Sequence, residues 1–163
     1  MEPHYNVLFL CTGNSARSVM AEGIMNARGG PRFTAYSAGS RPSGVVRIEA
    51  LRELEAAGIP TDRLSSKSWN EFSRPGAPRI DFVFTVCDHA VKEGCPVWPG
   101  HPVTAHWGLP DPAAVEGTED EIRRAFRHAF LMLDQRIALF LDLPLSSINS
   151  LALKNKLDDI GLR

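Results

Sequence analysis

The sequence predicts an α/β fold in which helices cover both faces of a four-stranded parallel sheet. Three observations lead to this prediction: short apolar runs typical of strands, helical patterns that alternate with them, and the lack of an internal repeat or linker. A chain of 163 residues can bury one full core, so we expect a single domain over residues 1–163. Ligands of such sheets bind at the carboxyl ends of the strands.

The expected strands are short apolar or alternating segments bounded by turn residues. They are Val7–Leu10, Phe33–Ser37, Asp81–Val86 and Val103–His106. The first and third are apolar almost throughout, as in strands buried on both faces, and the second alternates. The fourth has the weakest pattern.

The expected helices have apolar residues three or four positions apart and recognisable residues at their ends. They run from Ser15 to Gly29-Gly30, from Pro42-Ser43 to Gly58, from the Thr118–Glu121 capping box to Pro144, and from Ser147 to near Gly161. The third has the clearest apolar stripe, which includes Phe126, Leu133 and Phe140.

The composition excludes several classes of protein. It is 44% hydrophobic and 23% charged, as in an ordinary globular protein, and a net charge of -1 argues against nucleic acid or an anionic membrane as a partner. The first apolar run is too short for a signal peptide, and no stretch is apolar enough to span a membrane. Three cysteines, an odd number, favour a reducing, cytoplasmic setting.

One motif carries chemistry: a cysteine, five residues, an arginine and a hydroxyl, placed between the first strand and the first helix. This segment, the anion loop, consists of Cys11, Thr12, Gly13, Asn14, Ser15, Ala16, Arg17 and Ser18. Free N–H groups at a helix N-terminus converge on one point, and Gly13 permits a tight path, so the loop is expected to cradle a tetrahedral oxyanion.

Two side chains complete the expected anion site. The guanidinium of Arg17 can clamp two oxygens of the oxyanion. The same field, with a hydroxyl from Ser15 or Ser18, is expected to lower the pKa of Cys11 and make its thiolate a nucleophile. The alternative is a buried structural cysteine followed by a solvated arginine.

The sequence resembles the low-molecular-weight protein tyrosine phosphatase superfamily and, within it, the arsenate reductases that draw electrons from thioredoxin. The resemblance covers essentially the whole chain and is carried by the anion loop, Tyr36–Gly39, Thr85–Cys87 and Asp111-Pro112. It implies a four-stranded parallel sheet flanked by helices. It also implies that Asp111 is the general acid that protonates the leaving oxygen, although Asp-Pro also occurs as a plain turn.

The resemblance further implies a relay of three thiols. Cys11 attacks arsenate, Cys87 attacks Cys11 and expels arsenite, and Cys95 attacks Cys87, which leaves a Cys87–Cys95 disulfide for thioredoxin to reduce. The polar segment 88–94 suits a piece that rearranges between partners. Relatives that use glutathione with glutaredoxin, or mycothiol, share the loop, so these donors stay open. We expect a monomer with no bound cofactor.

Two other functions remain open. The first is a phosphomonoester phosphatase that uses only Cys11, Arg17 and Asp111, and the second is a non-catalytic oxyanion or redox sensor. The phosphatases usually carry aromatic residues after Asp-Pro, whereas Ala113-Ala114 follow here, so an aryl substrate would lack a stacking wall.

Metal binding is the last alternative. Zinc ligands are available in Cys87, Cys95, His101 and His106, but the close pairings of structural zinc sites are missing and we expect no metal. Some of the arsenate reductases bind potassium behind the loop, at positions that match Asn14, Glu22 and Ser37. Lys67 falls near the remaining position, where its ammonium is expected to pair with Glu22 and replace the ion.

Overall fold

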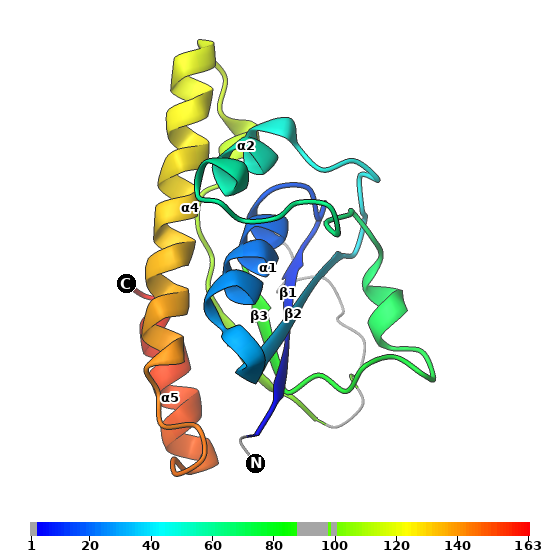
Figure 1. Ribbon diagram of the computed structural model, residues 1–163, viewed down its shortest axis with the longest axis vertical. Helices are drawn as coiled ribbons and strands as arrows, with labels where there is room; N and C mark the ends of the chain where they lie inside the picture. Colours follow the sequence, from blue (N-terminus) through cyan, green and yellow to red (C-terminus); the bar gives the residue numbers. More distant parts are fainter. Residues whose placement is uncertain (1–2, 88–97, 99–100) are drawn as a thin grey trace.

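The computed structural model describes residues 3–87, 98 and 101–163. Its centre is a parallel sheet with strand order β2-β1-β3-β4 (Figure 1). The strands are β1 (Tyr5–Cys11), β2 (Phe33–Gly39), β3 (Phe82–Thr85) and β4 (Val103–His106). The expected four-stranded parallel sheet is therefore confirmed, with β1 and β2 longer and β3 shorter than the sequence predicts.

Helices of two kinds accompany the sheet. The α-helices are α1 (Arg17–Arg28), α2 (Ile48–Ala56), α4 (Glu119–Leu141) and α5 (Ser150–Ile160). The 3₁₀ helices are η1 (Gly30–Arg32), η2 (Trp69–Phe72) and η3 (Pro112–Ala114). The capping box at the start of α4 is confirmed, because the Thr118 hydroxyl accepts a hydrogen bond from the Glu121 N–H at 3.1 Å. No helix in the described ranges is long and apolar enough to cross a membrane.

Three helices begin later than the sequence predicts. Helix α1 begins at Arg17 and not at Ser15. The second helix begins at Ile48 and not at Pro42-Ser43, because the backbone before it bonds to the anion loop. The last helix is capped by Asn149, whose side chain accepts from the Ala152 N–H at 2.8 Å. The hydroxyl of Ser147, the expected cap, bonds instead to the carbonyl of Pro144.

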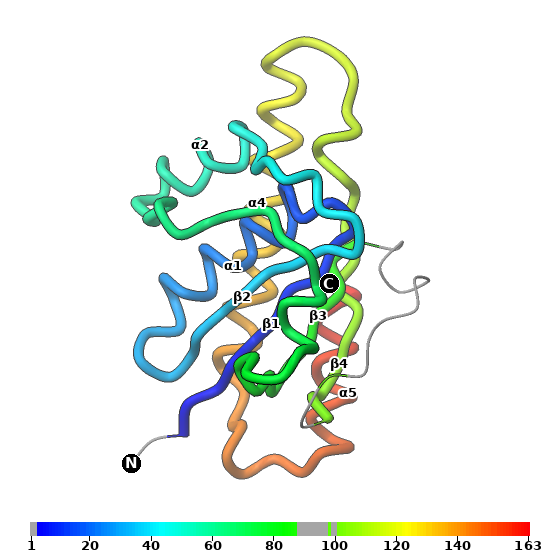
Figure 2. The backbone as a smooth tube through the Cα atoms, turned by 90° about the vertical axis from the view of Figure 1, so that its right-hand side faces the viewer, coloured from blue at the N-terminus to red at the C-terminus, as the bar shows by residue number. Residues whose placement is uncertain are grey.

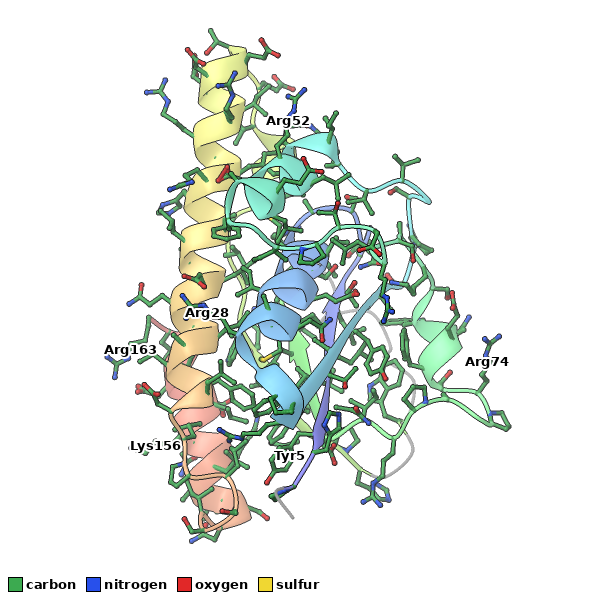
Figure 3. All side chains as sticks on the ribbon, in the orientation of Figure 1. Tyr5, Arg28, Arg52, Arg74, Lys156 and Arg163 are labelled. Carbon is green, nitrogen blue, oxygen red and sulfur yellow. The ribbon has the colours of Figure 1, made fainter. Side chains whose placement is uncertain are left out.

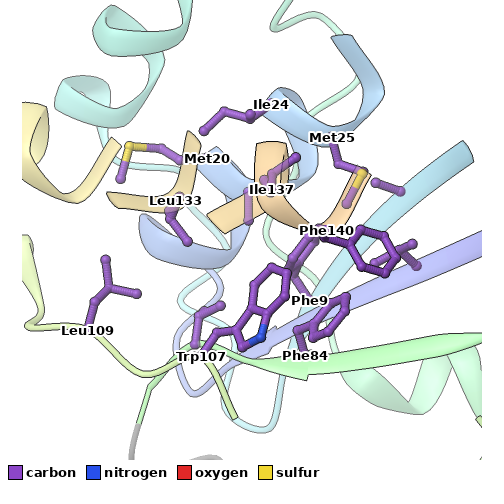
Figure 4. Packing of buried hydrophobic residues seen from close by; sticks show 14 of the residues in the cluster. Phe9, Met20, Ile24, Met25, Phe84, Trp107, Leu109, Leu133, Ile137 and Phe140 are labelled. Carbon is purple, nitrogen blue, oxygen red and sulfur yellow. The ribbon is translucent and has the colours of Figure 1, made fainter. Parts of the chain in front are cut away.

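The α-helices pack in one apolar cluster with the sheet face that carries Phe9 and Phe84. The indole of Trp107 stacks on Phe84, with ring centroids 3.9 Å apart, and α1 and α4 close over them (Figure 4). Leu8 and Leu10 face the other way and pack with side chains of η2 and of Trp98. Helical elements therefore cover both faces, while charged side chains such as Arg74 and Lys156 lie at the periphery (Figure 3).

All four strands end at the same edge of the sheet because they are parallel. Helix α2 and the start of α4 lie beyond that edge (Figures 1 and 2). The register places Cys11 opposite Gly39 and Thr85 opposite His106 at the strand ends. The segments with expected chemistry therefore meet at this edge.

Candidate active site

The anion loop joins β1 to α1 through one residue in the left-handed region. That residue is Asn14, with φ of 46°, and not Gly13, where an added Cβ would touch only the Ser15 Oγ at 3.6 Å. The buried Asn14 amide donates to the Ser18 Oγ at 2.8 Å and accepts from the Lys67 N–H at 2.9 Å. The tight path expected at Gly13 therefore lies at Asn14, whose side chain is fixed on both sides.

A second segment, 41–47, holds the outer side of the loop. Three of its backbone N–H groups, those of Arg41, Ser43 and Arg47, donate to the carbonyls of Thr12, Gly13 and Ser15 at 3.0, 2.9 and 2.9 Å. The Ser66 hydroxyl also donates to the Gly13 carbonyl, at 3.1 Å. A loop whose N–H groups face an anion needs donors for its carbonyls, but nothing in the pattern of 41–47 predicts that this segment supplies them.

The thiols of Cys11 and Cys87 lie together at the end of the sheet. Both are buried, and the Thr12 N–H donates to the Cys87 Sγ at 3.3 Å. A hydrogen bond with Cys87, together with burial, raises the pKa of Cys11, while the Arg17 guanidinium and the Thr12 backbone lower it. The net direction is upward, so the lowered pKa expected for Cys11 is wrong for this arrangement. The Ser18 hydroxyl, which is expected from the sequence to donate to the thiolate, accepts a hydrogen bond from the Asn14 side-chain amide.

Arg17 and Asp111 meet across the site. The Arg17 Nη1 donates to the Leu109 carbonyl at 2.9 Å, and its Nη2 lies 3.5 Å from the Asp111 Oδ2. The Arg17 Nε is buried and has no hydrogen-bond partner in the described part of the chain. The Asp111 Oδ1 accepts from the Ala113 N–H at 3.0 Å, which caps η3. The guanidinium therefore has donors to offer an oxyanion, and a carboxyl group stands beside them.

Behind the loop, the ammonium of Lys67 occupies the position expected for a cation. Its Nζ donates to the carbonyls of Ser37 and Ser65 at 3.0 and 2.8 Å and lies 3.9 Å from the Glu22 Oε1. Burial raises the pKa of Glu22, and the Ser37 hydroxyl and Lys67 lower it. The expected pairing of Lys67 with Glu22 is present.

The remaining expected residues are placed as follows. Cys95 and the segment 88–94 lie outside the described residues. The Nδ1 of His106 lies 2.8 Å from the Thr85 Oγ1. Within residues 3–87, 98 and 101–163, no group of three or more His, Cys, Asp and Glu side chains could hold a metal ion.

Known proteins are similar to this chain in sequence and in fold. Residues 6–154 match the family described as low molecular weight phosphotyrosine protein phosphatase. An arsenate reductase of Oceanobacillus iheyensis is 35% identical over 136 residues, which cover 82% of this chain and 93% of that protein.

Solved structures agree with this match. An arsenate reductase in its oxidised state has a TM-score of 0.65 at 26% identity, over 81% of this chain and 92% of that one. The thioredoxin-dependent arsenate reductase of Corynebacterium glutamicum, at 24% identity, shares the fold with a TM-score of 0.55, over 84% of this chain and 63% of that one. The chain therefore belongs to the low molecular weight phosphotyrosine protein phosphatase family, in the group of its arsenate reductases.

Proposed function

We propose that this enzyme reduces arsenate to arsenite through a relay of Cys11, Cys87 and Cys95 and is regenerated by thioredoxin. The observation that carries the proposal is the contact between the buried thiols of Cys11 and Cys87. Hydrolysis of a phosphate ester needs one thiol, whereas reduction of arsenic(V) to arsenic(III) needs a second thiol to take up the oxidising equivalents. The second thiol already lies against the first.

In the first step, the anion loop N–H groups and Arg17 hold the arsenate oxygens. The Arg17 guanidinium opposes the rise in the pKa of Cys11, the Cys11 proton passes to an arsenate oxygen, and the sulfur attacks arsenic. A sulfur–arsenic bond forms, the arsenic–oxygen bond breaks, and the protonated oxygen leaves as water with its second proton supplied by Asp111. The distance of 3.5 Å between the Arg17 Nη2 and the Asp111 Oδ2 supports this role, because an oxyanion held by Arg17 lies next to that carboxyl group.

In the second step, the sulfur of Cys87 attacks the sulfur of Cys11. A disulfide forms, the sulfur–arsenic bond breaks, and its electron pair stays on arsenic, which leaves as arsenite. Cys95 then attacks Cys87 and frees Cys11, and thioredoxin reduces the Cys87–Cys95 disulfide by thiol exchange. The sum is arsenate, two electrons and two protons giving arsenite and water. The role of Cys95 follows from the resemblance, and that of thioredoxin also from the fold shared with the Corynebacterium enzyme.

We also propose a cytoplasmic setting, a monomer and no bound cofactor. The relay needs three reduced thiols and a dithiol donor, which a reducing compartment supplies.

The proposal is tested by measuring arsenite formed from arsenate with thioredoxin, thioredoxin reductase and NADPH, beside hydrolysis of p-nitrophenyl phosphate. We expect sustained arsenite production, and its loss in Cys11→Ser. Parallel assays with glutathione and glutaredoxin, and with mycothiol, identify the donor. Efficient ester hydrolysis without arsenite from any donor would establish the phosphatase instead, and arsenate binding without either reaction would indicate a sensor.

A further inference from the structure

Arg136 of α4 is a buried cation that the proposed chemistry does not use. It is 4% exposed, and its Nη1 donates to the carbonyls of Trp107 and Gly108 at 2.8 and 3.2 Å. Its Nη2 donates to the main-chain oxygen of Arg163 at 3.3 Å, and Arg163 lies beside α4 (Figure 3). Its Nε is buried without a hydrogen-bond partner in the described part of the chain. Burial lowers the pKa of this guanidinium.

Burying the Arg136 guanidinium in the core costs desolvation free energy. No carboxylate side chain among the described residues forms an ion pair with Arg136. Its hydrogen-bond partners are main-chain oxygens of Trp107, Gly108 and Arg163, the last residue of the sequence. Removing a charge from water is costly even when it has hydrogen-bond partners, and an apolar side chain of similar volume would avoid that cost. The guanidinium holds two consecutive carbonyls, those of Trp107 and Gly108, in place by hydrogen bonds. An apolar side chain could not form these bonds.

The two carbonyls begin the segment 107–111, which connects β4 to the general acid. The start of this segment is fixed: the Trp107 indole N–H donates to the Leu157 carbonyl at 3.0 Å. A Cβ added to Gly161 would lie 2.2 Å from the His106 carbonyl oxygen, so α5 approaches this point as closely as a glycine allows. Trp107 and the sheet below it are therefore held in one arrangement.

The end of the same segment reaches the anion loop. The Leu109 carbonyl accepts from the Arg17 Nη1 at 2.9 Å, and Asp111 lies 3.5 Å from the Arg17 Nη2. Two arginines thus hold three successive carbonyls, Arg136 from α4 and Arg17 from α1. The path from Arg136 to Asp111 consists of main chain that is hydrogen-bonded at positions 107, 108 and 109.

We propose that Arg136 is a positioning residue that fixes Asp111 beside Arg17 by holding the Trp107 and Gly108 carbonyls. The inference rests on the proposed function, in which Asp111 gives a proton to the leaving oxygen. Displacement of a catalytic group by about 1 Å can lower a rate by on the order of 100-fold, so a small shift of this segment is enough to slow the reaction.

A double-mutant cycle between positions 136 and 111 tests the inference. Arg136→Lys keeps the charge and most of the volume but offers one nitrogen to the carbonyls. We expect it to lower kcat for arsenate by about tenfold, with little change in KM for arsenate. Asp111→Asn alone is expected to lower kcat by roughly 100-fold. When Asp111 is already replaced, Arg136→Lys should change kcat by less than about twofold, because its route of action is gone.

Two further variants complete the experiment. Arg136→Met removes the charge and is expected to lower kcat more than Arg136→Lys does. Arg123→Met changes an exposed arginine of the same helix and is the matched control, with an unchanged kcat expected. Thermal melting of each variant shows whether it is folded. If Arg136→Met does not fold, the milder Arg136→Lys decides.

The outcomes separate this inference from the proposed function. If Arg136→Lys lowers kcat by the same factor with and without Asp111, Arg136 acts only on the overall structure and the inference is overturned. The proposed role of Asp111 would stand in that case. An unchanged kcat in both variants at position 136 would overturn it as well. An unchanged kcat in Asp111→Asn would overturn the general-acid role, and the inference would fall with it.

Discussion

The reactivity of Cys11 depends on two neighbours that act in opposite directions. Arg17 is close in sequence, and its effect on the thiol follows from the motif. Cys87 is far away in sequence: its contact with Thr12 joins residues 75 positions apart. The sequence therefore predicts the lowering influence of Arg17, but the pairing with Cys87 that reverses the direction of the pKa shift comes from the fold.

Removing the Cys87 thiol should lower the pKa of Cys11, because that thiol's hydrogen bond is the largest cause of the upward shift. We compare Cys95→Ser with Cys87→Ala/Cys95→Ser, so that Cys11 is the only thiol left in the second protein. The rate of alkylation by iodoacetamide is measured against pH. The midpoint is expected to move down and the rate at pH 7 to rise. A midpoint that stays or rises would contradict the hydrogen bond between the Cys11 and Cys87 thiols.

The same shift has a consequence for stability. A thiol whose folded pKa is raised contributes stability below its unfolded pKa of about 8.5 and loses it as the pH rises toward the folded pKa. The parent protein should therefore lose unfolding free energy above about pH 8.5, and the variant without Cys87 should lose less. Urea unfolding at a series of pH values measures both curves.

Lys67 should make the enzyme independent of potassium. Its ammonium bonds two carbonyls and lies near Glu22, so kcat and Tm are expected to be the same in potassium, sodium and choline salts. Lys67→Ala leaves the buried Glu22 carboxyl without that cation and should cost about 2 kcal/mol of unfolding free energy. Potassium should restore part of this loss, since an ion that binds only the folded state stabilises it.

A matched control for Lys67→Ala is Lys154→Ala, which removes a more exposed ammonium paired with Asp158. Its unfolding free energy should change by less than about 1 kcal/mol and should not respond to potassium. A potassium requirement in the parent protein, equal to that of Lys67→Ala, would show that the ammonium does not replace an ion.

At the scale of elements, the strands and the start of α4 follow from the sequence pattern, whereas the starts of α1, α2 and α5 do not. Thr118 caps α4 as its pattern predicts, because the hydroxyl and the N–H that it accepts from lie within one turn. The start of α2 is shifted by hydrogen bonds to another segment: the N–H groups of Ser43 and Arg47 donate to carbonyls of the anion loop. In a helix that began at Pro42, these N–H groups would point away from the loop. The local sequence pattern does not predict such long-range hydrogen bonds.

The contact between the end of β2 and the anion loop requires a glycine. A Cβ at Gly39 would lie 2.4 Å from the Thr12 oxygen and 2.7 Å from the Cys11 oxygen, both of them backbone atoms. Gly39→Ala must therefore move the loop, and we expect a loss of about 1–3 kcal/mol of unfolding free energy together with a higher KM for arsenate.

Gly13→Ala is the stability control for Gly39→Ala, because its added Cβ would meet only the Ser15 Oγ at 3.6 Å. Its unfolding free energy should change by less than about 1 kcal/mol. Urea unfolding measures the stability of both variants. If they lose the same unfolding free energy, the close backbone contacts at Gly39 are not the reason why a glycine is needed there.

At the scale of the whole molecule, the parallel topology assembles the site. The sequence order of strands and helices predicts that the segments starting at Cys11, Cys87 and His106 lie at one edge of the sheet. The register agrees, because it pairs Leu10 with Thr85 and Thr85 with His106 at the strand ends. The chemistry of the anion loop is equally visible, because its residues are contiguous. The pairing of Arg17 with Asp111 depends on the path of residues 107–111, which Arg136 and Trp107 hold through contacts across the core. These contacts join residues that are far apart in the sequence, so composition and hydrophobic periodicity do not predict them.

The relay predicts different end states for two cysteine variants. Cys87→Ser should stop after the Cys11–arsenate adduct, because the thiol that contacts Cys11 and breaks the sulfur–arsenic bond has been removed. Cys95→Ser should release one arsenite per enzyme and stop as a Cys11–Cys87 disulfide, since those two thiols are already in contact. Mass spectrometry after a stoichiometric arsenate pulse shows which sulfurs are joined.

The matched reaction for both variants is hydrolysis of p-nitrophenyl phosphate, where it is detectable. Hydrolysis of this ester should continue in Cys87→Ser and in Cys95→Ser, because it is not a redox reaction and needs neither thiol. Cys11→Ser should abolish it together with arsenate reduction, which separates loss of the nucleophile from loss of the relay. Multiple turnovers by Cys95→Ser with thioredoxin as the sole donor would rule out the third thiol and favour direct attack of the donor on the Cys11–Cys87 disulfide.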